Sequence, residues 1–80
     1  PVDILIRAYD RSGLLRDVSQ VLLNEKINVL EVSTRSNKDD NTASMMLTIE
    51  ITGLDGLGRL LGRISQLPNI IEARRNRNAG

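Results

Sequence analysis

Residues 42–52, with the sequence TASMMLTIEIT, alternate between two kinds of side chain. Every second position from Ala43 to Ile51 is apolar, and the positions between them are mostly polar. A period of two residues is typical of a β-strand that buries one face. The stretch therefore predicts a strand in the middle of a sheet, with its apolar face on the core.

Three further stretches favour strands. Residues 2–9 have the same alternation, and residues 70–75 predict a short last strand. Residues 27–35 predict another strand, but its alternation breaks between Val29 and Leu30, so we expect a β-bulge or burial of both faces there. Residues 36–41 are polar, which predicts an antiparallel hairpin between the strands on either side.

Two segments have apolar residues at helical spacing. The first runs from Leu14 to about Lys26, and the second runs from Leu57 until Pro68 stops it. The order is β-α-β-β-α-β, and connection rules favour one solution. We expect an α+β, ferredoxin-like fold in which a four-stranded antiparallel sheet carries both helices on one face, with the first and third strands central.

Gly58 and Gly62 lie one turn apart inside the second predicted helix. A glycine there costs about 1 kcal/mol relative to alanine. Close packing of helices explains that cost, and we expect it against the first helix in preference to a partner molecule.

Composition excludes several kinds of chemistry. The 80 residues include no cysteine and no histidine, Tyr9 is the one aromatic residue, and the net charge is +1. Thiol, imidazole and zinc chemistry are excluded, and no pair of carboxylates suggests acid–base catalysis. We expect one domain over residues 1–80, a fragment of a longer cytoplasmic protein with no membrane span, no cofactor and no enzyme activity of its own.

The loop of residues 10–15, DRSGLL, joins the first strand to the first helix. Asp10 or Ser12 is a candidate N-cap, and capping is also the simplest role for Asp17. The free N–H groups of a helix N-terminus favour a carboxylate or phosphate, and Gly13 allows close approach. The sequence leaves both a capped turn and an anion site open.

This loop, followed by a helix and by the segment Ile27-Asn28-Val29, resembles the ACT-domain family over nearly the whole chain. The resemblance implies a module that pairs as a homodimer and often binds an amino-acid effector. It also implies that the effector-binding or interface residues are Asp10, Arg11, Ser12, Gly13, Leu14 and Asn28.

Four segments in the same order, YDRSGLLRD (9–17), NEKINVL (24–30), LGRLLG (57–62) and IEARR (71–75), resemble the C-terminal ACT domain of RelA/SpoT-type GTP pyrophosphokinases. The resemblance implies that the catalytic domains of a (p)ppGpp synthetase lie upstream. This fragment would then be a regulatory domain, with oligomerisation, an effector or the ribosome as its signal.

Arg74, Arg75 and Arg77 concentrate positive charge near the C-terminus. Guanidinium groups suit phosphate, and the resemblance favours ribosomal RNA as their partner. A solvated edge strand protected by its charges is the alternative. Stacking of single-stranded bases is disfavoured, because the middle of the expected central strands offers Leu5, Met46 and Thr48 where an RNA-recognition motif would carry aromatic side chains.

Overall fold

The computed structural model describes residues 1–51 and 53–76 of the chain. The elements are β1 (Val2–Tyr9), α1 (Leu14–Asn24), β2 (Asn28–Asn37), β3 (Thr42–Glu50), α2 (Leu54–Ser65) and β4 (Ile70–Arg75). The predicted order of strands and helices is confirmed. β2 was predicted over 27–35 and begins and ends later, whereas β3 ends before the predicted residue 52, which lies outside the described residues.

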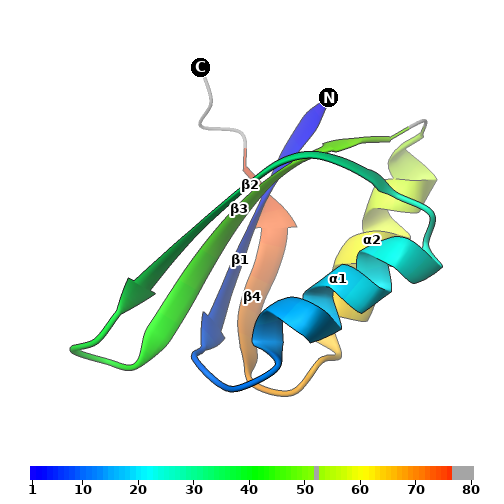
Figure 1. Ribbon diagram of the computed structural model, residues 1–80. Coiled ribbons are helices and arrows are strands. Elements are labelled where there is room, and N and C mark those ends of the chain that lie inside the picture. The colour runs from blue at the N-terminus through cyan, green and yellow to red at the C-terminus, as the bar shows by residue number, and fades with distance from the viewer. Residues whose placement is uncertain (52, 77–80) are drawn as a thin grey trace.

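The four strands form one antiparallel sheet in the order β2-β3-β1-β4, so β1 and β3 are central as predicted. Both helices cover the same face of this sheet (Figure 1). The other face is free of helices, and there Leu5 and Met46 lie opposite each other, half-buried. The ferredoxin-like arrangement predicted from the sequence is therefore confirmed.

The core lies between the sheet and the two helices. The alternating residues of β1 and β3 supply its floor, because every second side chain of a strand points to the same face. One stripe of each helix supplies its roof, with the stripes spaced for a turn of 3.6 residues. The buried apolar residues are Ile4, Ile6, Ala8, Leu14, Val18, Leu22, Ala43, Met45, Leu47, Ile49, Leu57, Leu60 and Ile64.

β2 contains the expected bulge. Val29 pairs with Ile49 and Glu31 pairs with Thr48, so Leu30 is an extra residue with no partner position on β3. Its side chain is exposed. The break in alternation between Val29 and Leu30 therefore marks a β-bulge and not a strand buried on both faces.

The expected close packing at Gly58 and Gly62 is wrong within the chain. A Cβ atom built at either position has no neighbour within 4 Å. The sequence shows that the two glycines share a helix face, but the distance to the next element is set by how α2 lies on the sheet. Neither glycine is needed for a tight approach to α1.

The end of α1 is joined to α2 by charge. Glu25 follows α1, and its carboxylate is 2.8 Å from Nε of Arg59 and 2.9 Å from Nε of Arg63. The Glu25 side chain is mostly buried, while both arginines are more than half exposed. One carboxylate therefore holds two successive turns of α2 beside α1.

Candidate functional site

The β1–α1 loop is the first candidate site, and its shape depends on Gly13. This residue is the N-cap of α1 with φ = 83° and ψ = 1°, and no side chain caps the helix. Its carbonyl oxygen accepts the first helical hydrogen bond, from the N–H of Asp17 at 2.9 Å. The predicted capping by Asp10, Ser12 or Asp17 is wrong, because glycine in the left-handed region makes the turn by itself.

Arg11 holds this loop in place. Its Nη2 is 2.7 Å from Oδ2 of Asp17, its Nε donates to the carbonyl oxygen of Pro68 at 3.2 Å, and its Nη1 donates to the carbonyl oxygen of Ser12 at 3.3 Å. The hydrogen bond from Arg11 lowers the pKa of Asp17 below its ordinary value, with a smaller contribution from Arg16. Arg11 is thus engaged by the protein and ties α1 to the α2–β4 turn.

The β1–α1 loop, the β2–β3 hairpin turn and the α2–β4 turn meet where β1 ends. The N–H of Tyr9 donates to the carbonyl oxygen of Asn69, and the N–H of Asp10 donates to that of Asn41, both at 2.9 Å. Leu14, the first helical residue, is buried in the core. The candidate loop of residues 10–14 is consequently fixed by the hairpin turn on one side and the α2–β4 turn on the other.

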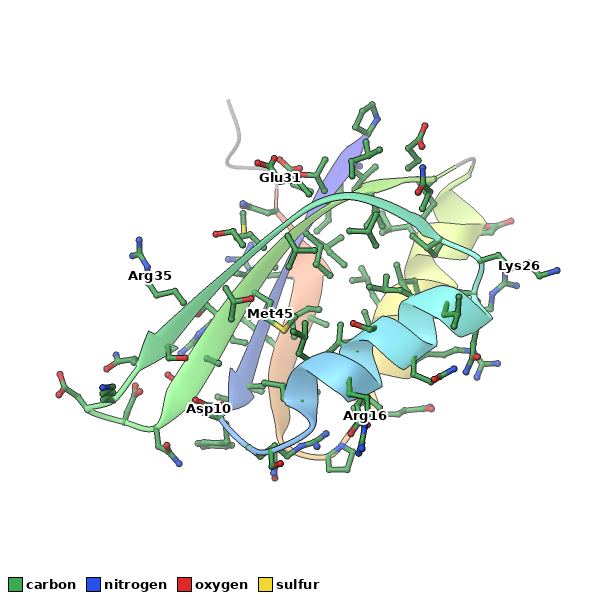
Figure 2. All side chains as sticks on the ribbon, in the orientation of Figure 1. Asp10, Arg16, Lys26, Glu31, Arg35 and Met45 are labelled. Atoms are coloured by element: carbon green, nitrogen blue, oxygen red, sulfur yellow. The ribbon has the colours of Figure 1, made fainter. Side chains whose placement is uncertain are left out.

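Asn28 lies away from that loop. It begins β2 at the far end of α1, and its Nδ2 donates a hydrogen bond to the carboxylate of Glu50. Asp10 and Lys26, labelled in Figure 2, mark the two ends of α1, which is about 16 Å long at 1.5 Å per residue. Within one chain, the predicted effector residues are therefore not brought together.

The arginines of β4 do not form one cluster. Arg74 pairs with Leu5 on the helix-free face, whereas Arg75 pairs with Ile4, whose side chain points to the helices. Arg74 also lies 3.7 Å from Glu72, which is 3.6 Å from Arg7. Arg77 lies outside the described residues. Neighbouring residues of a strand point to opposite faces, so the pair Arg74-Arg75 serves two different surfaces.

Sequence reasoning missed an apolar groove between α1 and β2. The groove has a volume of about 320 Å³ and is open to solvent, and Ser19, Met45 and Leu47 are part of its lining. On its rim, Leu15 and Leu23 of α1 are 55% and 71% exposed, and Val32 of β2 is 48% exposed. The sequence could have indicated this groove, because positions 15, 19 and 23 are spaced four residues apart and share one face of the helix.

Two further findings concern only the described part of the chain. None of its helices has the length and apolar character to span a membrane. None of its histidine, cysteine, aspartate and glutamate side chains gather in groups of three or more that could hold a metal ion.

Comparison with known proteins gives a consistent result. A family model described as "ACT domain" matches residues 1–75. The GTP pyrophosphokinase of Escherichia coli K12 is 50% identical over 72 residues, which are 90% of this chain and 10% of that protein. A bifunctional (p)ppGpp synthase/hydrolase RelA of Mycobacterium tuberculosis is 32% identical over 74 residues, 92% of this chain and 10% of that protein.

Solved structures agree on the fold. The crystal structure of the ACT domain from the GTP pyrophosphokinase of Chlorobium tepidum superimposes with a TM-score of 0.81 at 19% identity. The match covers 94% of this chain and 95% of that one. In contrast, this chain spans about a tenth of the length of the curated relatives it matches.

Proposed function

This chain belongs to the ACT-domain family, and from that premise we propose that it is a regulatory domain of a GTP pyrophosphokinase. The observation that carries the proposal is the 50% identity to the Escherichia coli enzyme over 72 residues. Identity to the bifunctional enzyme is lower, at 32%, which favours a parent that synthesises (p)ppGpp over one that also hydrolyses it. A parent that uses nucleotides is expected to work in the cytoplasm.

The domain acts by binding and not by chemistry. Its sequence has no cysteine or histidine, and the carboxylates of Asp17 in α1 and of Glu25 at the α1–α2 contact are engaged by arginines. Control of an attached enzyme then requires a change in what the domain contacts. A second copy, a small effector and the ribosome are the three candidate contacts.

A domain exchange tests this proposal. The segment of the Escherichia coli enzyme that aligns with this chain is replaced by residues 1–75, and (p)ppGpp synthesis is measured with and without ribosomes carrying uncharged tRNA. We expect the hybrid to keep the regulated ratio of the intact enzyme, and deletion of the segment to change it.

A second hybrid, with the matching segment of the Mycobacterium tuberculosis enzyme, is the control for the exchange itself. If that hybrid keeps control and the hybrid with this chain behaves as the deletion does, the proposed function is wrong. Two hybrids that both keep control support it.

For a small effector, the candidate site is the loop of residues 10–14 with the N-terminus of α1. The N–H of Leu14 donates to the carbonyl oxygen of Arg11 at 3.3 Å, but no side chain caps the helix, so the N–H groups of Leu15 and Arg16 are the ones open to a carboxylate. Addition of amino acids to the 80-residue chain should then raise its Tm, because a ligand that binds only the folded state stabilises it. Amino-acid amides, which lack the carboxylate, are the matched ligands and should produce no shift.

RNA contact is the second candidate function, and the helix-free face favours it. Arg7 pairs with Ser44, which also pairs with Arg35, so two cations flank a hydroxyl across three strands, with Arg74 on the same face. Arg35 has no ion pair with any described residue. Arg35→Ala with Arg74→Ala should flatten the salt dependence of ribosome binding by the parent, whereas Arg75→Ala, on the opposite face, should not. Equal effects of the two changes would argue against this surface.

A further inference from the structure

The helix-free face of the sheet holds a small pocket between β2 and β3. Its volume is about 250 Å³, and it is lined by Ser33 and Arg35 of β2 and by Ser44 and Met46 of β3. Most ligand pockets are larger, at roughly 300–1,000 Å³. The pocket therefore suits one small polar group, and the rest of any ligand would lie outside it.

The pocket exists because two short side chains stand beside two long ones. Ser33 pairs with Met46 and Arg35 pairs with Ser44, so the serines lie on one diagonal and the long side chains on the other. Met45, between the two β3 residues, is buried under the helices, which places its neighbours on the opposite face. Figure 2 shows Arg35 projecting from β2 away from the helices. The space over the serine hydroxyls is thus bordered by a guanidinium group.

The polar groups of the pocket have no partners in the described part of the chain. The hydroxyls of Ser33 and Ser44 form no side-chain hydrogen bond there, and the Arg35 guanidinium forms neither a hydrogen bond nor an ion pair. In contrast, Asp3 on the same face accepts a hydrogen bond from the hydroxyl of Thr48 at 2.8 Å. Hydroxyl and guanidinium groups are hydrogen-bond donors. The pocket therefore presents several unused donors around one space.

A second arginine stands beside the pocket on β1. Ser44 pairs with Arg35 on one side and with Arg7 on the other, so the two arginines lie two strand spacings apart, about 10 Å at the backbone. Arg7 is 3.6 Å from Glu72 of β4, which is too long for a strong hydrogen bond. Two long side chains that lean toward each other over Ser44 can hold one anion between them.

We propose that this pocket binds the phosphate end of a small phosphorylated molecule. Arg35 and Arg7 supply forked N–H groups that match phosphate oxygens, and the two serines supply neutral donors beneath them. A phosphate monoester carries about 1.5–2 negative charges at pH 7, so it gains more from two guanidinium groups than a carboxylate does. The inference rests on the proposed regulatory function, for which it names a class of effector other than an amino acid.

The charges around the pocket favour a small ligand over an RNA strand. The row across the sheet that holds both arginines ends at Glu72 on β4. The row of Thr48, closer to the start of β1, holds Asp3 and Glu31. An RNA strand that continues from the pocket along the first row or toward the second passes a carboxylate. A single phosphate group stays at the basic end of the face and meets none of them.

A titration of the 80-residue chain with inorganic phosphate tests the site, followed by two-dimensional amide NMR at constant ionic strength. We expect saturable shifts of the signals around the pocket, at Ser33, Arg35 and Ser44. Sodium chloride at the same ionic strength should produce no saturable shift. Sodium acetate should bind at least about tenfold more weakly, because it carries one negative charge and fewer acceptor oxygens.

Substitutions identify the binding groups. Arg35→Ala should raise the dissociation constant for phosphate by at least about tenfold, and Ser44→Ala should raise it by a smaller factor, because hydrogen bonds to charged donors are the stronger ones. Arg75→Ala makes the same charge change as Arg35→Ala on the opposite face and should leave the constant unchanged. Arg35 is exposed on an edge strand, so its replacement should leave the amide spectrum away from the pocket unchanged.

Several outcomes overturn the inference. A titration without saturable shifts does so, and so does an equal effect of Arg35→Ala and Arg75→Ala. Shifts confined to Leu15 and Arg16 would place the anion at the N-terminus of α1 instead. A single-stranded RNA that binds this face when phosphate does not would assign the arginines to RNA contact.

None of these results affects the domain exchange described above, which tests regulation in the parent enzyme. Failure of this site and failure of the regulatory function are therefore distinguishable.

Discussion

Replacement of Gly58 or Gly62 by alanine is expected to stabilise this domain. Both glycines lie inside α2, and a Cβ atom at either position has no neighbour within 4 Å. Alanine therefore introduces no clash and restricts the unfolded chain, which favours folding. The sign is opposite to the one expected if α2 packed tightly on α1 at these positions.

The magnitude follows from helix propensity. Glycine is less favourable than alanine by about 0.8–1 kcal/mol in a helix interior, and open space leaves that difference undiminished. Each substitution should raise the free energy of unfolding by about 1 kcal/mol, which corresponds to a rise in Tm of about 4–8 °C for a domain of this size. The double variant should gain about twice as much.

Gly13→Ala is the matched control with the opposite sign. Its φ of 83° lies in the left-handed region, and a Cβ atom would be 3.1 Å from Nη2 of Arg16. The backbone strain should cost about 1–2 kcal/mol. All three variants are compared by urea denaturation at low protein concentration, where a dimer contributes least.

A loss of stability in Gly58→Ala or Gly62→Ala at low concentration would refute this reasoning, because it would require a close neighbour within the chain. A gain in stability together with weaker self-association would instead place the glycines at a contact between copies.

Three further predictions concern the contacts that position the helices. Glu25→Gln should lower the free energy of unfolding by about 1–2 kcal/mol in low salt and by less in high salt, because the carboxylate bonds two largely exposed arginines. Equal urea midpoints for the variant and the unmodified domain at both salt concentrations would contradict this prediction. Asp17 should contribute stability above its ordinary pKa, and this contribution should be lost as the pH falls through the lowered pKa of the folded state; an acid unfolding profile that Asp17→Asn leaves unchanged would contradict the pairing with Arg11. Leu60→Ala, at a fully buried position, should cost about 2–5 kcal/mol, whereas Leu15→Ala on the exposed rim should cost far less, and calorimetry that ranks the two in reverse order would contradict the assigned core.

The sequence predicted best those features that depend on the residue pattern within a single strand or helix. Alternation in residues 2–9 and 42–52 identified both central strands, because a strand that buries one face must place apolar residues at every second position. The break in alternation between Val29 and Leu30 identified the bulge for the same reason. The faces of Arg74 and Arg75 could also have been predicted, since adjacent strand residues point to opposite sides.

The candidate loop was recognised, but its internal contacts were not. Gly13 stood out by its residue type, yet its left-handed conformation removed the need for a side-chain cap. Arg11 then bonds Asp17 and the carbonyl oxygen of Pro68, which is distant in sequence. No local pattern encodes this contact, because the α2–β4 turn lies beside the loop only through the pairing of β4 with β1.

The sequence by itself determined the elements, their order, the core faces and the family resemblance, since each of these depends on spacing along one strand or helix. Only the tertiary structure decided the open space around Gly58 and Gly62, the separation of Asn28 from the Gly13 loop, and the groove beside β2. These features depend on the distance between elements, which is fixed by how whole faces pack on one another and not by the pattern within any one of them.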